Sequence, residues 1–242
     1  MHRMSEWNDR MIAFMDDASS YGSYFQALSA ELSKYIDGDQ TVCDAGCGIG
    51  QLTFALSPGV KKITGIDRSE SAIRFCKEKR RVSGLSNVDF RCADFSDLED
   101  GVLFDIMVFN YFGRMEQIME IARRHCLSRV IIIKKNYTEH RFSIGKNPIE
   151  ERELYGADKY LEREKIAHTQ RLFSHEFGQP FKSIEDAVEF FSIYSRDSDK
   201  SVVNTENVQS RLVKTTNPVF PYYLPHVRNS RIYIIDMKEV PR

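Results

Sequence analysis

The sequence predicts an α/β fold with a mostly parallel β-sheet whose two faces are covered by helices. Two observations lead to this prediction. Short apolar segments with strand character alternate with segments whose apolar residues recur every three or four positions, as in amphipathic helices. The strands are separated by helices and not by tight hairpin turns, which is the pattern of right-handed βαβ connections in a parallel sheet.

The chain has 242 residues, which suits one α/β domain with a substantial core. We expect a single domain, 1–242, in three parts: N-terminal helices over 1–40, a core over 41–135, and a later region, 136–242, that shapes the substrate site. Residues 5–36 carry apolar residues at helical spacing, interrupted around Ser19–Ser23. This pattern predicts two helices before the first strand.

The elements of the core follow in strict alternation. The predicted strands are Thr41–Ala45, Lys62–Asp67, Val88–Cys92, Asp105–Asn110 and Arg129–Lys134. The predicted helices are Gln51–Leu56, Ser69–Ser83, Met115–His125 and a short one over 96–101.

Beyond residue 135 the pattern changes. We expect a charged helix over 149–166, a long strand over 167–177, and an amphipathic helix over Ser183–Tyr194 that begins with a Ser-x-x-Asp cap. Residues 196–229 read as rich in loops, and Arg231–Met237 as a final strand.

Charge and cysteine content narrow the function classes. The formal net charge is −1, which gives no general attraction to nucleic acid. The five cysteines form no Cys-x-x-Cys pair, so we expect reduced thiols and no metal site. Residues 1–17 lack the apolar core of a signal peptide, and no apolar run is long enough to span a bilayer. A cytoplasmic protein is therefore expected.

The segment Val42–Gly50 is the most informative part of the chain. The first strand ends in Asp44, and Gly46, Gly48 and Gly50 follow at alternate positions before a helix begins. A strand that turns into a helix over glycines lets a nucleotide-like ligand approach the backbone and the helix N-terminus. The spacing G-x-G-x-G differs from the G-x-G-x-x-G of dinucleotide sites, and a carboxylate here suits a cationic ligand better than a pyrophosphate.

Two further acids follow the next strands. Asp67 ends the second strand and can accept both hydroxyls of a ribose, although Asp is also a preferred helix N-cap. Asp94 follows the third strand and can accept from an adenine amino group, with Phe95 or Ile49 packing on the ring. For Asp44 the alternative is a carboxylate that stabilises the turn.

With these residues, the chain resembles the class I S-adenosylmethionine-dependent methyltransferases over about residues 40–135. The resemblance implies a seven-stranded Rossmann-like sheet whose last strand is antiparallel, with the segments 167–177 and 231–237 as strands six and seven. It implies S-adenosylmethionine as methyl donor and N-terminal helices that cover it. The cofactor-binding residues expected on this basis are Asp44, Ala45, Gly46, Cys47, Gly48, Gly50, Asp67, Arg68, Ala93, Asp94, Phe95, Asn110 and Tyr24.

The fourth strand ends in Asn110-Tyr111-Phe112-Gly113, a tip that in this family faces the methyl group. Some amino-methylating members carry Asn- or Asp-Pro-Pro-aromatic there, and both prolines are absent from this chain. No catalytic group is identified; Asn110, Tyr111 and His140 are the candidates.

The expected reaction is methyl transfer to a small molecule, because aromatic residues are frequent over 137–160 and 219–227 and suit an apolar pocket. They also suit the packing of a lid. A protein or RNA methyltransferase is the alternative and predicts a basic or extended groove beside Asn110. A regulator that binds the donor without transfer is a third possibility and predicts a pocket plugged by Tyr111 or Tyr222.

Overall fold

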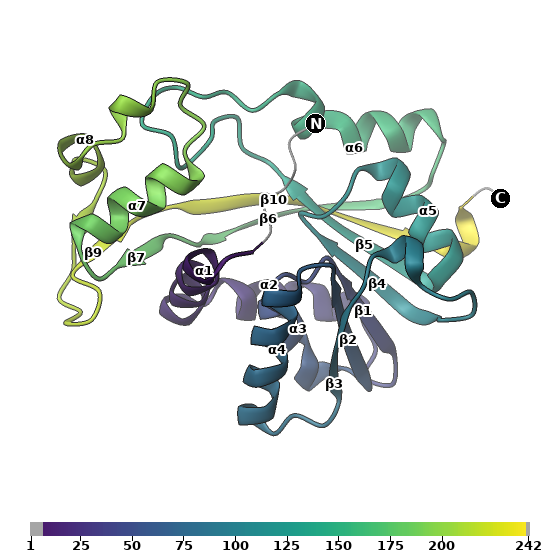
Figure 1. Cartoon of the computed structure of the whole chain (residues 1–242). Coiled ribbons are helices and arrows are strands. Elements are labelled where there is room, and N and C mark those ends of the chain that lie inside the picture. Colours follow the sequence, from purple (N-terminus) through teal and green to yellow (C-terminus); the bar gives the residue numbers. More distant parts are fainter. Residues whose placement is uncertain (1–6, 241–242) are drawn as a thin grey trace.

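The computed structural model describes residues 7–240, and its core is a seven-stranded sheet with the strand order β3-β2-β1-β4-β5-β10-β6 (Figure 1). β1 to β5 run parallel, and β10 is antiparallel to both of its neighbours, β5 and β6. The expected seven-stranded sheet with an antiparallel last strand is confirmed. The strands are β1 (Thr41–Ala45), β2 (Lys62–Asp67), β3 (Val88–Cys92), β4 (Phe104–Asn110), β5 (Cys126–Lys135), β6 (Thr169–Glu176) and β10 (Val227–Asp236).

Helices cover both faces of this sheet because each buries an apolar side against it. One face packs on α2, α3 and α4, and the other on α5 and α6. The helices are α1 (Asp9–Tyr21), α2 (Tyr24–Leu32), α3 (Gln51–Leu56), α4 (Glu70–Ser83), α5 (Met115–His125) and α6 (Glu151–Arg163). The predicted break between the first two helices falls at residues 22 and 23. Residues 5 and 6, which were expected to begin the first helix, lie outside the described range.

An accessory lobe, which we define as residues 177–226, separates β6 from β10. It contains β7 (Gln179–Phe181), α7 (Ile184–Tyr194), α8 (Thr205–Gln209), β8 (Val213–Lys214) and β9 (Tyr222–Leu224). The three strands form a small antiparallel sheet in the order β7-β9-β8. Its own apolar cluster includes Phe181, Phe190, Phe191 and Leu224, together with Phe14 from α1.

The segment 196–229 is rich in loops, as predicted, but it also holds the short elements α8, β8 and β9 and the first residues of β10. The final strand begins at Val227 instead of Arg231, since its first four residues pair with β6 without an apolar pattern that the sequence would show.

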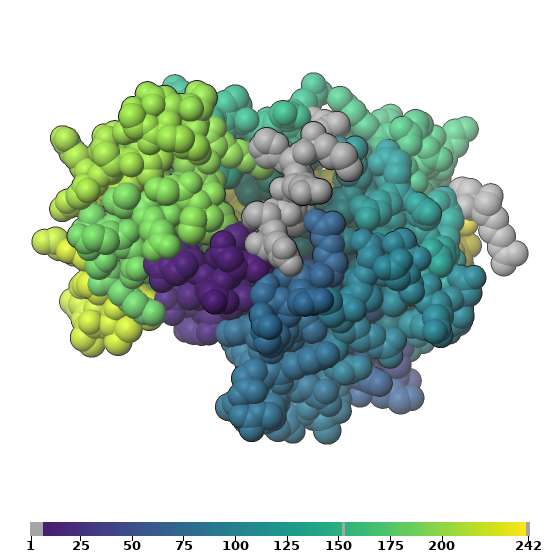
Figure 2. Space-filling model, in the orientation of Figure 1, coloured from purple at the N-terminus to yellow at the C-terminus, as the bar shows by residue number. Residues whose placement is uncertain are grey.

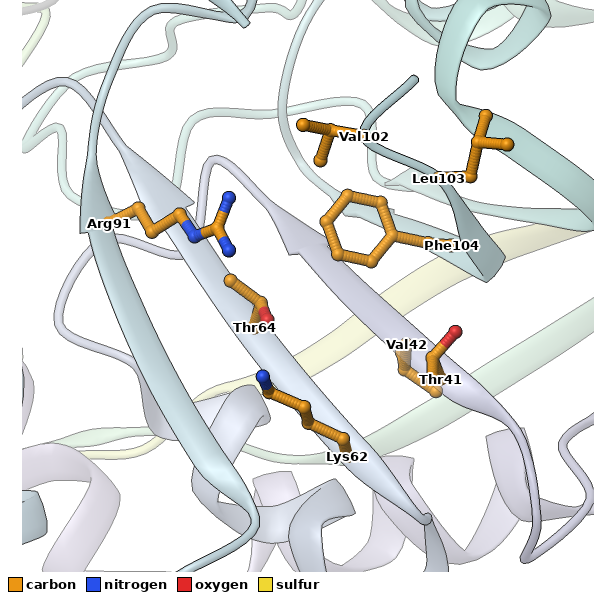
Figure 3. A pocket seen from close by; sticks show the side chains of 8 residues that line it. All are labelled: Thr41, Val42, Lys62, Thr64, Arg91, Val102, Leu103 and Phe104. Atoms are coloured by element: carbon orange, nitrogen blue, oxygen red, sulfur yellow. The ribbon is translucent and has the colours of Figure 1, made fainter. Parts of the chain in front are cut away.

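The short helix expected over 96–101 is also absent. The chain forms only a single 3₁₀ turn, Phe95–Asp97, which the Asp94 side chain caps. Beside this segment a hollow of about 340 Å³ opens on the sheet, lined among others by Thr41, Lys62 and Phe104 (Figure 3). These residues begin β1, β2 and β4, whereas the glycine turn follows the end of β1. The hollow is therefore separate from the predicted site.

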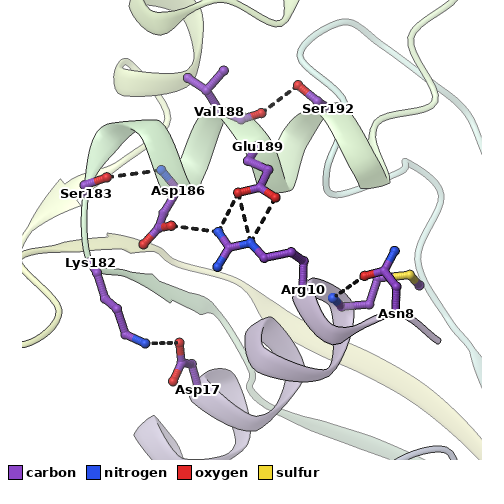
Figure 4. Close-up of polar contacts among 10 residues, drawn as sticks. Asn8, Arg10, Asp17, Lys182, Ser183, Asp186, Val188, Glu189 and Ser192 are labelled. Carbon is purple, nitrogen blue, oxygen red and sulfur yellow. Dashed lines mark hydrogen bonds and ion pairs between the residues drawn. The ribbon is translucent and has the colours of Figure 1, made fainter. Parts of the chain in front are cut away.

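Ion pairs join α1 to the accessory lobe (Figure 4). The Arg10 guanidinium donates to Asp186 Oδ1 at 2.7 Å and to Glu189 Oε1 at 2.9 Å, both on α7. Lys182 Nζ lies 3.2 Å from Asp17 Oδ2. The N-terminal helix thus bridges the core and the lobe.

Candidate functional site

The turn between β1 and α3 is built from three glycines in the left-handed region, with φ of +71° at Gly46, +53° at Gly48 and +74° at Gly50. A Cβ atom on Gly46 would lie 2.2 Å from the Phe112 ring, and one on Gly48 would lie 2.9 Å from the Trp7 indole. Only glycine combines these backbone angles with such close neighbours.

Asp67 fastens this turn to the second strand. Its Oδ2 accepts from the Gly48 amide at 2.9 Å, and its Oδ1 accepts from the Ser69 amide at 2.9 Å. The N-cap of α4 is Ser69, so the reading of Asp67 as that cap is wrong. Each carboxylate oxygen keeps a free acceptor site and the residue is partly exposed, so the geometry fits two ribose hydroxyls.

Asp44 is almost completely buried, and its Oδ2 accepts from the Thr53 hydroxyl at 2.6 Å. This bond ties β1 to α3, as the turn-stabilising alternative expects. Burial raises the pKa of Asp44 to about 6. Because Asp44 pairs with Val108, its side chain and that of Asn110 project to the same face from neighbouring strands. A bound ammonium group would stabilise the ionised carboxylate.

The tip of β3 is more exposed. Asp94 Oδ1 accepts from the Ser96 amide at 3.0 Å, and this bond holds the pKa of Asp94 below its usual value. Arg68 lies close enough to contribute to the same shift. The Phe95 ring is buried and packs 5.9 Å from that of Phe112, so it supports the wall of the site from inside the core.

The other expected residues of the turn serve its packing. Ala45 is fully buried, and the Ala93 amide donates to the Asp67 carbonyl at 3.1 Å. Burial raises the pKa of the Cys47 thiol, which keeps it neutral. Ile49, expected as an alternative ring contact, is buried between α1 and α4.

The tip of β4 holds two unusual features. The Asn110 Oδ1 atom is buried, and no described residue donates a hydrogen bond to it. Tyr111 adopts φ +57°, a strained backbone for a bulky residue, and its hydroxyl lies 2.6 Å from Ser230 Oγ. Strain of this kind is concentrated at functional sites, where surrounding contacts maintain it.

Lys134, which the sequence did not single out, fixes the same tip. Its Nζ donates to the Gly113 carbonyl at 2.7 Å and to the Phe112 carbonyl at 3.2 Å. Burial, followed by the charge of Lys135, lowers the pKa of Lys134 to about 8. The side chain acts as a clamp on the backbone that follows Tyr111.

Next to Tyr111 lies a cluster that we call the arginine box: Tyr24, Tyr111, Tyr137, Arg141, Phe177, His226 and Arg228. The Arg228 Cζ atom lies 4.3 Å from the Phe177 ring centroid, 5.0 Å from that of Tyr111 and 5.1 Å from that of Tyr24. Arg141 stacks over Phe142 at 3.9 Å and shares the Phe177 ring at 5.5 Å. The box therefore joins α2, the ends of β4, β5 and β6, and the beginning of β10.

Of the box, the sequence predicted Tyr24 as a cofactor-binding residue and Tyr111 as a catalytic candidate, and Tyr137 was among the late aromatics. It missed both arginines and His226. One pattern pointed weakly to Arg228: it lies two and four positions before Ser230 and Ile232, on the same face of a strand with buried residues. This pattern can be recognised only once β10 is known to begin at Val227.

His140 belongs to the loop after β5. Its Nδ1 lies 3.0 Å from Ser143 Oγ, and burial, with the charge of Arg196, lowers its pKa to about 4. In the described part of the chain no contact joins it to Asn110 or Tyr111, and its role as a base stays a prediction. Residues 7–240, which the structure describes, contain no group of three or more metal-ligating side chains. They also contain no helix long and apolar enough to cross a membrane.

The comparisons with known proteins agree with this geometry. A family model described as a methyltransferase domain matches residues 36–183, more than half of the chain. The ribosomal protein L11 methyltransferase of Clostridium botulinum is 30% identical over 113 residues, 45% of this chain and 36% of that protein. The mouse tRNA (uracil-5-)-methyltransferase homolog A is 37% identical over 68 residues, 28% of this chain and 11% of that protein. The chain thus matches only a minor part of either relative.

Solved structures extend the similarity of fold to most of the chain. A SAM-dependent methyltransferase from Aquifex aeolicus superposes with a TM-score of 0.53 and 18% identity, covering 95% of this chain and all of that one. The YcgJ protein of Bacillus subtilis gives 0.54 and 14%, covering 88% and 98%.

Proposed function

Because this chain belongs to the methyltransferase domain family, we propose that it transfers the methyl group of S-adenosylmethionine to a small-molecule acceptor. One observation carries the proposal: acceptor groups suited to each end of the donor line the carboxyl edge of neighbouring strands. These are Asp67 at the tip of β2, and Asp44 and Asn110 on the same face of β1 and β4.

Different residues would bind different parts of the donor. Asp67 would accept the ribose hydroxyls, and Asp94 the adenine amino group. Asp44 and the unpartnered Asn110 Oδ1 would hold the ammonium of the methionine end. Bound S-adenosylmethionine supplies an electrophilic methyl group on a positively charged sulfur. The chain's own contribution is to hold the acceptor in line and to exclude water, with Lys134 fixing the β4 tip.

The acceptor side supports a small molecule. Beyond Tyr111 the strand edge is lined by the aromatic rings of the arginine box, from α2 and from the chain that enters and leaves the accessory lobe. Figure 2 shows the surface recessed between that lobe, in green, and the teal part of the core. The guanidiniums of Arg141 and Arg228 stack on aromatic rings next to Tyr111, an arrangement that favours a compact acceptor over RNA or protein.

We also place the protein in a reducing compartment such as the cytoplasm. The cysteines Cys43, Cys47, Cys76, Cys92 and Cys126 are all free, and three of them are buried. Free thiols of this kind persist where disulfides are kept reduced.

Two experiments test the proposal. Calorimetric titration should show binding of S-adenosylmethionine and S-adenosylhomocysteine and none of NAD; preferential NAD binding would refute it. Methyl-labelled S-adenosylmethionine, incubated with the protein and separate pools of metabolites, RNA and protein, should label the metabolite pool. Labelling confined to RNA or protein would establish the alternative, and tight binding without label in any pool would indicate the regulator.

A further inference from the structure

The arginine box contains two positive charges without negative partners. Among the described residues, neither Arg141 nor Arg228 forms an ion pair, although fifteen ion pairs occur elsewhere. Arg141 donates one hydrogen bond, to the Phe177 carbonyl at 2.8 Å. A guanidinium has five N–H donors, so most of this donor capacity is unused.

The acid next to the box in the sequence, Glu176, is engaged elsewhere. Glu176, the acid that precedes Phe177, accepts from the Tyr223 hydroxyl at 2.6 Å and from the His226 amide at 3.2 Å. Burial, followed by the positive charge of Arg228, lowers the pKa of Arg141 to about 9. Both guanidiniums are half-buried, and a charge that is partly removed from water is destabilising unless it is paired; no described residue of the box supplies a negative charge.

Other polar atoms in the box are not fully paired either. His226 Nε2 is buried without a hydrogen-bond partner among the described residues. The Tyr24 hydroxyl, in a residue only 1% exposed, has no partner there other than the neighbouring Arg228 guanidinium. Buried polar atoms are nearly always fully paired in folded proteins, so these two atoms beside two arginines without ion pairs indicate a missing partner. Donors from two guanidiniums and a hydroxyl call for an acceptor-rich, negatively charged group.

We propose that the arginine box binds the carboxylate of the methyl acceptor, so that the substrate is a small organic acid with a flat apolar body. This inference rests on the proposed function. Arginine forks bind carboxylates through two parallel hydrogen bonds, and the rings of Tyr24, Tyr111 and Phe177 offer stacking surfaces for the body. The reacting atom then lies toward the β4 tip, at Asn110 and Tyr111.

The donor also carries a carboxylate, but its position differs. Arg228 is on β10, three strand positions from β1, which corresponds to about 14 Å across the sheet. The donor's carboxylate is adjacent to its ammonium and so stays near Asp44 on β1. The two anions are therefore assigned to different ends of the site.

A stability measurement tests the missing counter-ion without any ligand. Arg228→Met keeps the apolar stem and removes the charge, so the melting temperature of the full chain should equal or exceed that of the wild type. Arg231→Met is the matched control on the same strand: its guanidinium pairs with Asp158, so it should melt lower. An Arg228 variant that melts as low as the control would show that the charge is structural and would overturn the proposal.

A binding measurement tests the ligand class. The full chain saturated with S-adenosylhomocysteine is titrated with 4-hydroxybenzoate, anthranilate and trans-cinnamate, each beside its neutral primary amide. At least one acid should bind ten-fold or more tightly than its amide, and Arg228→Met or Arg141→Met should reduce that ratio to below two. Acids that bind no better than their amides would contradict the proposal.

The same variants separate the two anions. S-adenosylhomocysteine affinity should change by less than two-fold in Arg228→Met; a ten-fold loss would assign the guanidinium to the donor and overturn the proposal. If S-adenosylhomocysteine fails to bind the wild type at all, the proposed function fails, whereas the stability comparison and an acid–amide titration of the free chain still decide whether the box is an anion site.

Discussion

The donor side and the acceptor side of the strand edge are assembled in different ways. The donor side comes mainly from one continuous stretch, residues 44–95, in which each acid lies at the carboxyl end of a strand or just after it. Asn110, at the end of β4, completes it. The acceptor side brings together residues that lie as far apart in the chain as Tyr24 and Arg228: Tyr24, Tyr111, Arg141, Phe177 and Arg228. A site built on successive strand tips can therefore be predicted from a sequence, whereas a site closed by distant segments cannot.

The two sides also differ in how their charges are satisfied. The donor-side acids are bonded by the chain itself: Asp67 by backbone amides, Asp44 by Thr53 and Asp94 by Ser96. In the described part of the chain, by contrast, neither Arg141 nor Arg228 forms an ion pair, and the bond that Arg141 donates to the Phe177 carbonyl brings no negative charge. The donor side is therefore largely preformed, while the acceptor side is completed by its ligand.

The largest expected effect is a loss of stability in the accessory lobe that leaves donor binding unchanged. Phe190 is buried in the accessory lobe with its ring 5.2 Å from Phe14 and 4.6 Å from Phe142. Phe190→Ala should lower the free energy of unfolding by about 3–5 kcal/mol, measured by urea denaturation. S-adenosylhomocysteine affinity of the folded variant should stay within two-fold.

Ile193 provides the control on the same helix, since it is 39% exposed. Ile193→Ala should cost less than about 1 kcal/mol. Loss of donor binding in the folded Phe190 variant would contradict this prediction, because it would mean that the accessory lobe and the donor side are coupled.

Asp67→Ala tests the donor side alone. It should weaken S-adenosylhomocysteine binding by about 1.5–3 kcal/mol, the scale of hydrogen bonds to a charged group, as measured by calorimetry. Asp97→Ala, an exposed acid beyond the next strand, is the control and should bind normally. Unchanged affinity in the Asp67 variant would refute the ribose assignment.

Donor affinity should also depend on pH through Asp44, whose pKa is raised to about 6 by burial. The ammonium of the donor favours the ionised carboxylate, so affinity for S-adenosylhomocysteine should fall below pH 6, by up to about ten-fold per pH unit. Asp44→Asn should abolish this dependence. A wild-type affinity that is flat between pH 5 and 7 would remove Asp44 from the donor site.

The raised pKa of Asp44 also determines how the stability of the protein changes with pH. Because the folded pKa lies above the ordinary value, the folded state binds the proton more tightly. The contribution of Asp44 to stability therefore decreases as pH rises from about 4 to 6 and is constant above that range.

The smallest expected effect concerns the ion pairs between α1 and the accessory lobe. Arg10 bonds Asp186 and Glu189 in good geometry but is substantially exposed. Arg10→Ala should therefore change the free energy of unfolding by at most about 1 kcal/mol, with a smaller difference at high salt. A loss above 2 kcal/mol in urea denaturation would show that α1 holds the lobe mainly through this arginine.

Several parts of the fold could be read from the sequence for local reasons. β1, β2, β3, α3 and α5 begin and end where their apolar patterns predict, and Gly46, Gly48 and Gly50 have the backbone angles that only a tight turn requires. The antiparallel last strand followed from the family resemblance and not from periodicity.

The rest depended on tertiary context. The first residues of β10 and the strands of the lobe are short and partly polar, so their pairing is decided by long-range contacts. The arginine box was missed because Arg141 lies in a loop and Arg228 in a segment expected to be irregular. A charged residue in such segments is ordinarily solvated, and only the assembled fold shows the rings around it.

A structure of the complex with S-adenosylhomocysteine would show both sides of the strand edge at once. We expect the ribose hydroxyls on Asp67, the ammonium beside Asp44 and Asn110, and the sulfur directed past Tyr111 toward Arg228. A product bound elsewhere, or with its sulfur directed away from the arginine box, would contradict this expectation.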